Sequence, residues 1–228
     1  PELLPIFAAG NSGVDKDKNG IIDPGSVSTP GTSKNALTVG ASENYNTTGG
    51  IQNKLSDLRI TKDNWPAEPI YSSRMSDDPH GISMFSSRGP TQDGRIKPEI
   101  VAPGTNILST KSHVNGASDL WGAYDANYCY SGGTSMATPL TAGAAVVARQ
   151  ALRQKFGQAR PSAALVKAFL MATADNLYPG QYGTGATQEI KAHPDSNQGF
   201  GLVNMDTVTQ DQQPVLVDET QGLGTGER

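Results

Sequence analysis

The sequence predicts an α/β fold in which a mostly parallel sheet is covered by helices. Two apolar runs, at residues 3–9 and 36–41, are nearly free of polar side chains. Continuous apolar runs of this length are typical of strands buried on both faces, as in parallel sheets. Two Ala- and Leu-rich segments, at residues 140–152 and 163–174, predict the helices. The 26 glycines and 15 prolines among 228 residues indicate that loops make up much of the remainder.

Local signals bound the elements of the first half. The strand at residues 3–9 is closed by Gly10, and residues 27–32 carry the Ser, Pro and Gly of a turn before the next strand. Residues 44–80 are polar and show no regular period. We therefore expect that segment to be an insertion that runs over the surface.

The second half reads as short strands followed by helices. A short strand is expected at residues 97–104, where Pro-Gly ends it, and an extended run at 128–131. The helix at 140–152 has apolar residues on most faces, so we expect it to be buried nearly all round. The helix at 163–174 begins after Ser162, a favoured N-cap residue. No internal repeat is evident.

Composition excludes several classes of function. The net charge is −4 and the basic residues are scattered, so no basic face for nucleic acid is expected. No apolar run approaches the roughly 18 residues of a membrane-spanning helix, so no membrane partner is expected either. The single cysteine, Cys129, lies in an aromatic strand pattern, which favours a buried structural thiol over a nucleophile.

Residues 132–139 read Gly-Gly-Thr-Ser-Met-Ala-Thr-Pro and open the first predicted helix. Two glycines, a serine and then a helical pattern place Ser135 at a helix N-terminus, where backbone N–H groups face any developing negative charge. An ordinary N-cap serine is the structural alternative. Pro139 falls in the first turns, where a missing N–H costs little. The string resembles the nucleophile motif of the subtilisin-like serine proteases (subtilases, peptidase S8), which implies that Ser135 is the nucleophile.

Residues 8–13, Ala-Ala-Gly-Asn-Ser-Gly, follow the first strand at the sheet edge where parallel α/β folds place ligands. A plain Asn-containing turn is the alternative. The string resembles the family segment whose asparagine donates its side-chain amide to the oxyanion of the tetrahedral intermediate, which implies that role for Asn11. By the same resemblance, a further set of residues is expected to line the primary specificity pocket: Ala8, Ala9, Gly10, Gly133 and Thr134.

Residues 15–23, Asp-Lys-Asp-Lys-Asn-Gly-Ile-Ile-Asp, match the first nine positions of an EF-hand-type calcium loop. Oxygen donors alternate, a glycine stands sixth, and the twelfth position is Ser26 rather than the bidentate glutamate. We expect a structural Ca²⁺ site of different coordination, and a solvated acidic turn is the alternative. Structural calcium is common in the family that the sequence resembles. The expected ligands are Asp15, Asp17, Asn19, Ile21 and Asp23.

Further segments resemble the same family in the same order. Residues 85–90, 97–104 and 197–204 match family segments that we expect to be structural rather than chemical, and Thr29–Pro30 matches a position where the peptide bond is cis. The resemblance implies the three-layer subtilisin-like architecture, with helices on both faces of the sheet. Residues 1–206 are expected to form the carboxyl-terminal portion of the catalytic domain. The polar, Gly-rich residues 207–228 are expected to be a linker or the start of another domain.

The family's aspartate and histidine should precede Asn11 in sequence, and both are absent from the chain. His80, His113 and His193 follow Asn11 in contexts unlike the family's histidine motif, so we expect surface or structural roles for them. The fold is therefore expected to be incomplete at its N-terminal side and inactive alone. We expect its first strand to expose an edge that associates with another copy or with the missing part of the same protein.

The expected function of the intact protein is a serine endopeptidase that hydrolyses polypeptides through an acyl-enzyme. The resemblance implies a secreted protein. An α/β-hydrolase is disfavoured, since Ala137 stands where its Gly-x-Ser-x-Gly turn needs the second glycine. A metalloprotease is excluded by the lack of a His-Glu-x-x-His motif. The alternative that remains is a non-catalytic calcium-binding or interaction domain with a protease-like fold.

Overall fold

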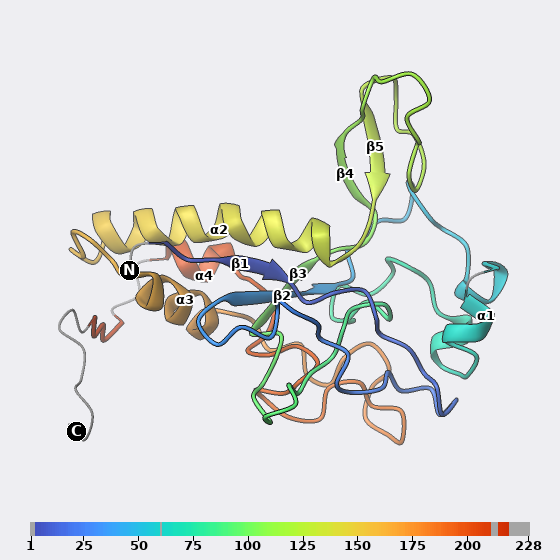
Figure 1. Ribbon diagram of the computed structural model, residues 1–228, viewed down its shortest axis with the longest axis horizontal. Coiled ribbons are helices and arrows are strands. Elements are labelled where there is room, and N and C mark those ends of the chain that lie inside the picture. The colour runs from blue at the N-terminus through green and yellow to red at the C-terminus, as the bar shows by residue number, and fades with distance from the viewer. Residues whose placement is uncertain (1–2, 60, 211–213, 219–228) are drawn as a thin grey trace.

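A three-stranded parallel sheet forms the centre of the computed structural model, which describes residues 3–59, 61–210 and 214–218 (Figure 1). Its strands, in spatial order, are β1 (Ile6–Ala8), β2 (Leu37–Ser42) and β3 (Ile100–Pro103). Strand β2 lies in the middle and is buried at every position. The predicted α/β class and the parallel sheet are confirmed.

The first strand is shorter than the apolar run that predicts it. Only Ile6–Ala8 pair with β2, and all three residues are half-buried. Leu3 at the start of the run is 79% exposed. Within the described residues β1 pairs on one side alone, so the backbone of its other edge has no strand partner. An edge strand, rather than one buried on both faces, is the result.

One long helix packs along the sheet. Helix α2 (Thr134–Gln154) contacts all three strands, and α3 (Ala163–Ala172) and α4 (Met205–Thr209) pack against α2 (Figure 1). The buried positions of α2 recur every three or four residues and are mostly small, which lets the helix lie close to the sheet: Ala137, Thr141, Ala144, Ala145, Ala148, Ala151 and Leu152. The expectation of burial on nearly all sides is wrong, because Leu140, Val146 and Val147 are exposed.

An antiparallel hairpin connects the sheet to the long helix. Strands β4 (Ile107–Thr110) and β5 (Tyr128–Ser131) pair with each other and stand out at the top of Figure 1. Strand β5 runs directly into the turn that begins α2. Cys129 of β5 is buried and free, as predicted.

The polar segment 44–80 is more than a surface insertion. It forms three short helices, η1 (Leu55–Asp57), α1 (Thr61–Asn64) and η2 (Ile70–Ser72). Four of its apolar side chains join the main core: Leu55, Trp65, Ile70 and Met75. The Trp65 indole N–H also donates to the Gly13 carbonyl at 3.1 Å, so the segment braces the loop after β1.

The packed unit continues past the predicted boundary at residue 206. Helix α4 crosses that boundary, and Val208 is buried in the main core. The Asp218 carboxylate accepts hydrogen bonds from the N–H and hydroxyl of Ser162. Most of the expected Gly-rich linker lies outside the described residues. Among the helices that are described, none combines the length and apolar character that a membrane span requires.

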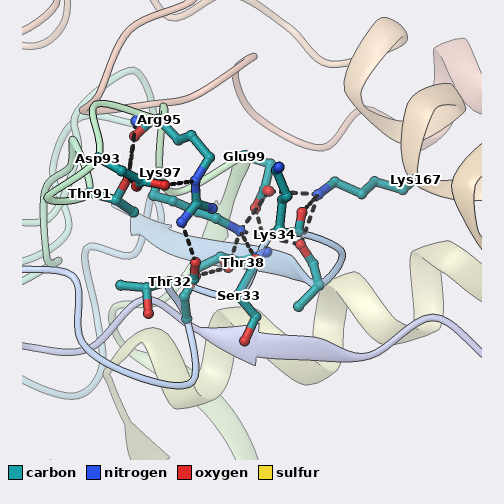
Figure 2. A network of polar contacts seen from close by, with 12 residues as sticks. Thr32, Ser33, Lys34, Thr38, Thr91, Asp93, Arg95, Lys97, Glu99 and Lys167 are labelled. Carbon is teal, nitrogen blue, oxygen red and sulfur yellow. Dashed lines mark hydrogen bonds and ion pairs between the residues drawn. The ribbon is translucent and has the colours of Figure 1, made fainter. Parts of the chain in front are cut away.

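A buried ion network joins the sheet to α3 and to the loop before β2 (Figure 2). The Glu99 carboxylate lies 2.6 Å from the ammonium groups of both Lys97 and Lys167. Lys97 also donates to the Ser33 carbonyl and to the Thr38 hydroxyl. Burial lowers the pKa of Lys97, and its hydrogen bond with Glu99 opposes that shift. The Thr29–Pro30 peptide bond near this loop is cis, as predicted.

Candidate active site

The turn before α2 presents Ser135 to solvent. Gly133 is the N-cap of α2, no side chain caps that end, and Ser135 is the second residue of the helix. Gly133 has φ 139°, which a side chain rarely adopts. A Cβ on Gly132 would lie 1.9 Å from the Trp121 ring, so this position also requires glycine. The N-cap interpretation of Ser135 is therefore wrong, and its side chain is exposed at the N-terminal turn.

Asn11, from the loop after β1, meets the same turn. Its Oδ1 accepts hydrogen bonds from the Thr134 backbone N–H at 2.9 Å and from the Thr134 hydroxyl at 3.0 Å. A backbone N–H can only donate, which fixes the carbonyl end of the Asn11 amide toward Thr134. The amide NH₂ is then left to donate elsewhere. The structure thus brings Asn11 and Ser135, which are far apart in the sequence, to the two sides of Thr134.

The residues expected to line the specificity pocket lie around this contact. The Gly10 N–H donates to the Thr134 hydroxyl at 3.3 Å, and Gly133 lies against the Asn11 amide. Ala8 and Ala9 precede them at the end of β1, where the Ala9 N–H bonds to β2 and its side chain is fully buried. Ala9 therefore contributes backbone rather than side-chain surface.

Pro139 lies in the first two turns of α2, as predicted. It is the sixth helical residue, so its missing N–H deprives the Ser135 carbonyl of its helical donor. The Thr138 hydroxyl bonds the preceding carbonyl, that of Thr134, at 2.7 Å. The first turn of α2 is therefore held partly by a side-chain hydrogen bond.

Gly104, directly after β3, also shapes the turn, although no sequence motif indicates it. Its carbonyl accepts the Gly133 N–H at 2.7 Å, and an added Cβ would lie 2.9 Å from the Gly133 carbonyl oxygen. The sequence predicts for Pro103-Gly104 only the end of a strand, and β3 does end at Pro103. The partner of Gly104 is Gly133, 29 residues later in the chain, so no local sequence pattern predicts this hydrogen bond.

The predicted calcium ligands lie in one loop whose oxygens bond to the loop itself. Asp15 is buried, and its carboxylate accepts the N–H groups of Asn19 and Gly20 at 2.9 and 3.0 Å. Asp23 accepts the Lys16 N–H, and the Asn19 side chain accepts the Ile21 N–H. Across residues 3–59, 61–210 and 214–218, no three His, Cys, Asp or Glu side chains are grouped to hold a metal ion.

Asp17 nevertheless lies in a crowded acidic environment. Loss of solvation raises its pKa, and the hydrogen bond with Asp15 and the charges of Asp23 and Asp15 raise it further. The donor types suit Ca²⁺, which prefers oxygen ligands. As arranged, however, the side chains do not form a coordination set.

The histidines are engaged away from Ser135. His80 pairs with Asp78 at 3.4 Å, and the His193 ring bonds to the Phe200 carbonyl at 3.0 Å. His113 lies exposed in the loop between the two hairpin strands. None of these contacts presents an imidazole to the Ser135 hydroxyl.

Comparison with known sequences identifies the family. The family model described as "Subtilase family" matches residues 2–201, nearly the whole chain. The chain belongs to the subtilase family. The turn at Ser135 and the loop at Asn11 both lie within the matched residues.

Similar proteins include bacterial peptidases. Serine protease AprX of Bacillus subtilis is 34% identical over 150 residues, which cover 65% of this chain and 26% of AprX. C5a peptidase of Streptococcus pyogenes is 35% identical over 122 residues, or 49% of this chain and 9% of the relative. This subtilase chain therefore matches only a minor part of their length.

Solved structures support the subtilase fold. The prenylagaramide maturation protease PagA superposes with a TM-score of 0.53 at 21% identity, covering 93% of this chain and 52% of PagA. Fervidolysin from Fervidobacterium pennivorans, a keratinolytic enzyme related to subtilisin, gives 0.51 at 23% identity, covering 93% of this chain and 23% of fervidolysin. At such identities the likeness establishes the fold alone.

Proposed function

We propose that the full-length protein carrying this chain is a serine endopeptidase that hydrolyses polypeptides through an acyl-enzyme. Ser135 Oγ attacks the peptide carbonyl carbon, and a base removes its proton. The Asn11 amide and the Ser135 backbone N–H donate to the oxyanion. The amine leaves after protonation, and water then hydrolyses the ester. The observation that carries this proposal is the Asn11–Thr134 contact, which sets an amide donor beside an exposed serine at a helix N-terminus.

In this proposal, the base that removes the Ser135 proton is not one of residues 1–228. His80 and His193 bond to other groups, and His113 belongs to the exposed loop of the hairpin. An Asp and a His from a preceding part of the same protein complete the triad, so the isolated chain is inactive. The open edge of β1 is the surface on which that part, or a second copy of the chain, docks. We infer from the family a secreted protein.

Labelling with a fluorophosphonate tests the nucleophile. The full-length protein should be labelled at Ser135, and Ser135→Ala should abolish the label. Asn11→Ala should lower kcat by about 10²–10³-fold, the usual effect of removing one oxyanion donor. Ser118→Ala, which changes an exposed loop serine, is the matched control and should label normally. A full-length protein that folds but takes no label would favour the non-catalytic domain instead.

We also propose that the loop at residues 15–23 binds Ca²⁺ weakly. The support is its oxygen-rich donor set and the raised pKa of Asp17, which a nearby cation would relieve. To bind the ion, the carboxylates of Asp15 and Asp23 must give up their hydrogen bonds with backbone N–H groups of the loop and coordinate Ca²⁺ instead. Calcium should raise the Tm of the wild type but not of Asp17→Asn. The control is Asp125→Asn, whose carboxylate accepts amides in the hairpin loop. An unchanged wild-type Tm at millimolar calcium would contradict the proposal.

A further inference from the structure

We propose that Ser87 is a positioning residue for the oxyanion donor Asn11. The inference rests on the proposed function, and it gives a role to a segment that the sequence analysis treated as structural. Ser87 touches neither substrate nor reacting atoms. It holds the chain on both sides of Asn11, so that the side-chain amide faces the Ser135 turn.

The backbone on each side of Asn11 bonds to this one serine. The Ser87 N–H donates to the Gly10 carbonyl at 2.9 Å. The Ser12 N–H donates to the Ser87 hydroxyl oxygen at 3.1 Å. Residues 10 and 12 are therefore fixed by two bonds to a single residue, and Asn11 lies between them.

Ser87 lies so close to the loop after β1 that position 10 has room only for glycine. Gly10 has φ +104°, and a Cβ at that position would lie 2.9 Å from the Ser87 hydroxyl oxygen. Gly13 bonds to the Phe85 carbonyl, and a Cβ there would lie 2.4 Å from the Met84 carbonyl oxygen. The loop thus lies against residues 84–87 at both of its ends. A rotation of the Asn11 backbone would break these contacts.

The two Ser87 hydrogen bonds and the Thr134 contact hold different parts of Asn11. Thr134 fixes the carbonyl end of the side chain, and Ser87 fixes the backbone from which that side chain departs. Both are needed, because an oxyanion donor contributes fully only when it is already aimed at the developing charge. Displacements of about 1 Å are enough to cost about 10²-fold in rate.

The neighbouring serine provides a matched control. Ser86 and Ser87 are both fully buried, and each hydroxyl oxygen accepts one backbone N–H. The donor to Ser86 is Ala41 in β2, at 3.0 Å, whereas the donor to Ser87 is Ser12. Loss of either hydroxyl should therefore affect stability alike. Only the loss of the Ser87 hydroxyl should change the orientation of the Asn11 side chain.

A double-mutant cycle in the full-length protein tests the inference. Ser87→Ala should lower kcat by about tenfold with KM changed less than about twofold, because a misaimed donor weakens only the transition state. Ser87→Thr, which keeps the acceptor oxygen, should restore most of kcat. Ser86→Ala should leave kcat unchanged while lowering Tm as much as Ser87→Ala does. In an Asn11→Ala background, Ser87→Ala should cause no further fall in kcat.

The outcomes separate this inference from the proposed function. If Asn11→Ala lowers kcat, and Ser87→Ala lowers it by the same further factor in the Asn11→Ala background as in wild type, the two residues act independently. The positioning role is then wrong. The same holds if Ser86→Ala lowers kcat as much as Ser87→Ala. If Asn11→Ala leaves kcat unchanged, the oxyanion role proposed for Asn11 is wrong, and the positioning role falls with it.

Discussion

At the scale of single residues, a buried acid directly after β2 makes stability depend on pH. Glu43 is 2% exposed. Burial raises its pKa well above the ordinary value, and the charges of Asp77 and Glu189 raise it further. Backbone N–H groups of Asp78 and Asp77 oppose the shift. An acid whose pKa is raised on folding stabilises the fold below its ordinary pKa, and that stability is lost as the pH rises through the raised value.

Glu43→Gln should therefore increase the free energy of unfolding at neutral pH. The amide removes the buried charge but keeps an oxygen for the two backbone donors. The gain over wild type should be larger at about pH 8 than at about pH 5 in urea unfolding, because at low pH the wild-type carboxyl is itself neutral. Glu68→Gln, at an exposed glutamate in the segment 44–80, should give no such trend. A gain independent of pH would contradict the assignment.

The sequence indicates the proposed nucleophile and oxyanion donor but not the contacts that orient them. Ser135 and Asn11 lie in strings specific enough to name. Their mutual contact through Thr134 joins residues 123 positions apart, which no local pattern encodes. Ser87 was missed for the same reason, because its partners lie 75 positions earlier. Positioning contacts of this kind are visible only once the loops have been brought together.

At the scale of the elements, α3 begins with a cap that also receives the end of the described chain. The Ser162 hydroxyl oxygen accepts the Leu165 N–H at 3.0 Å and donates to the Asp218 carboxylate at 2.5 Å. The Ser162 N–H donates to the same carboxylate. The acid lies at the positive end of the helix dipole, which is its favourable place. Residues 214–218 are thereby fastened to α3.

Ser162→Ala should lower the free energy of unfolding by about 1–2 kcal/mol, as the loss of an N-cap usually does. The substitution removes the bond to Leu165 and the hydroxyl bond to Asp218 while leaving the backbone intact. Urea unfolding followed by far-UV circular dichroism measures the difference. Ser112→Ala, which removes a hydroxyl from an exposed loop, should change stability little. Equal losses in the two variants would show that the cap contributes nothing.

In α2, apolar content predicts the helix but not which of its faces is buried. Its existence, and its start beside the glycine pair, follow from the sequence. Burial does not, because valine and leucine on the outer face look the same in sequence as those on the inner face. The alanines decide the packing, since they bring α2 close to β2, and Val146 is left 68% exposed. A tertiary contact, not the composition of the helix, selects its buried face.

At the scale of the whole molecule, the Glu99 network holds together parts that are distant in sequence. Glu99 belongs to the segment leading into β3, Lys167 to α3, and Ser33 to the loop before β2 (Figure 2). Its second carboxylate oxygen accepts the Thr38 N–H at 2.7 Å. The sequence predicts a short strand there but no buried charges, since lysine and glutamate are rarely buried unless paired. Lys167 lies 68 positions from Glu99, and Ser33 lies 64 positions from Lys97.

Removing the shared carboxylate should therefore be more damaging than removing either lysine. Glu99→Gln leaves the Lys97 ammonium buried beside a second ammonium with no counter-charge. Breaking a buried ion pair from one side costs about 3–5 kcal/mol, a large part of the stability of a domain. Lys167→Met leaves the Lys97–Glu99 pair intact, and its ammonium is more exposed than that of Lys97. It should cost about 1 kcal/mol, near the value of a surface pair.

Urea unfolding of the two variants beside wild type measures this order. The matched control is Asp93→Asn, which breaks an exposed ion pair with Arg95 near the same loop, and it should lower the stability much less than Glu99→Gln does, because water screens exposed pairs. Equal losses for Glu99→Gln and Asp93→Asn would show that water reaches the network. A loss confined to Glu99→Gln would mean that one carboxylate joins the sheet, α3 and the loop before β2 into a single cooperative unit. Its loss would then lower the stability of all three together.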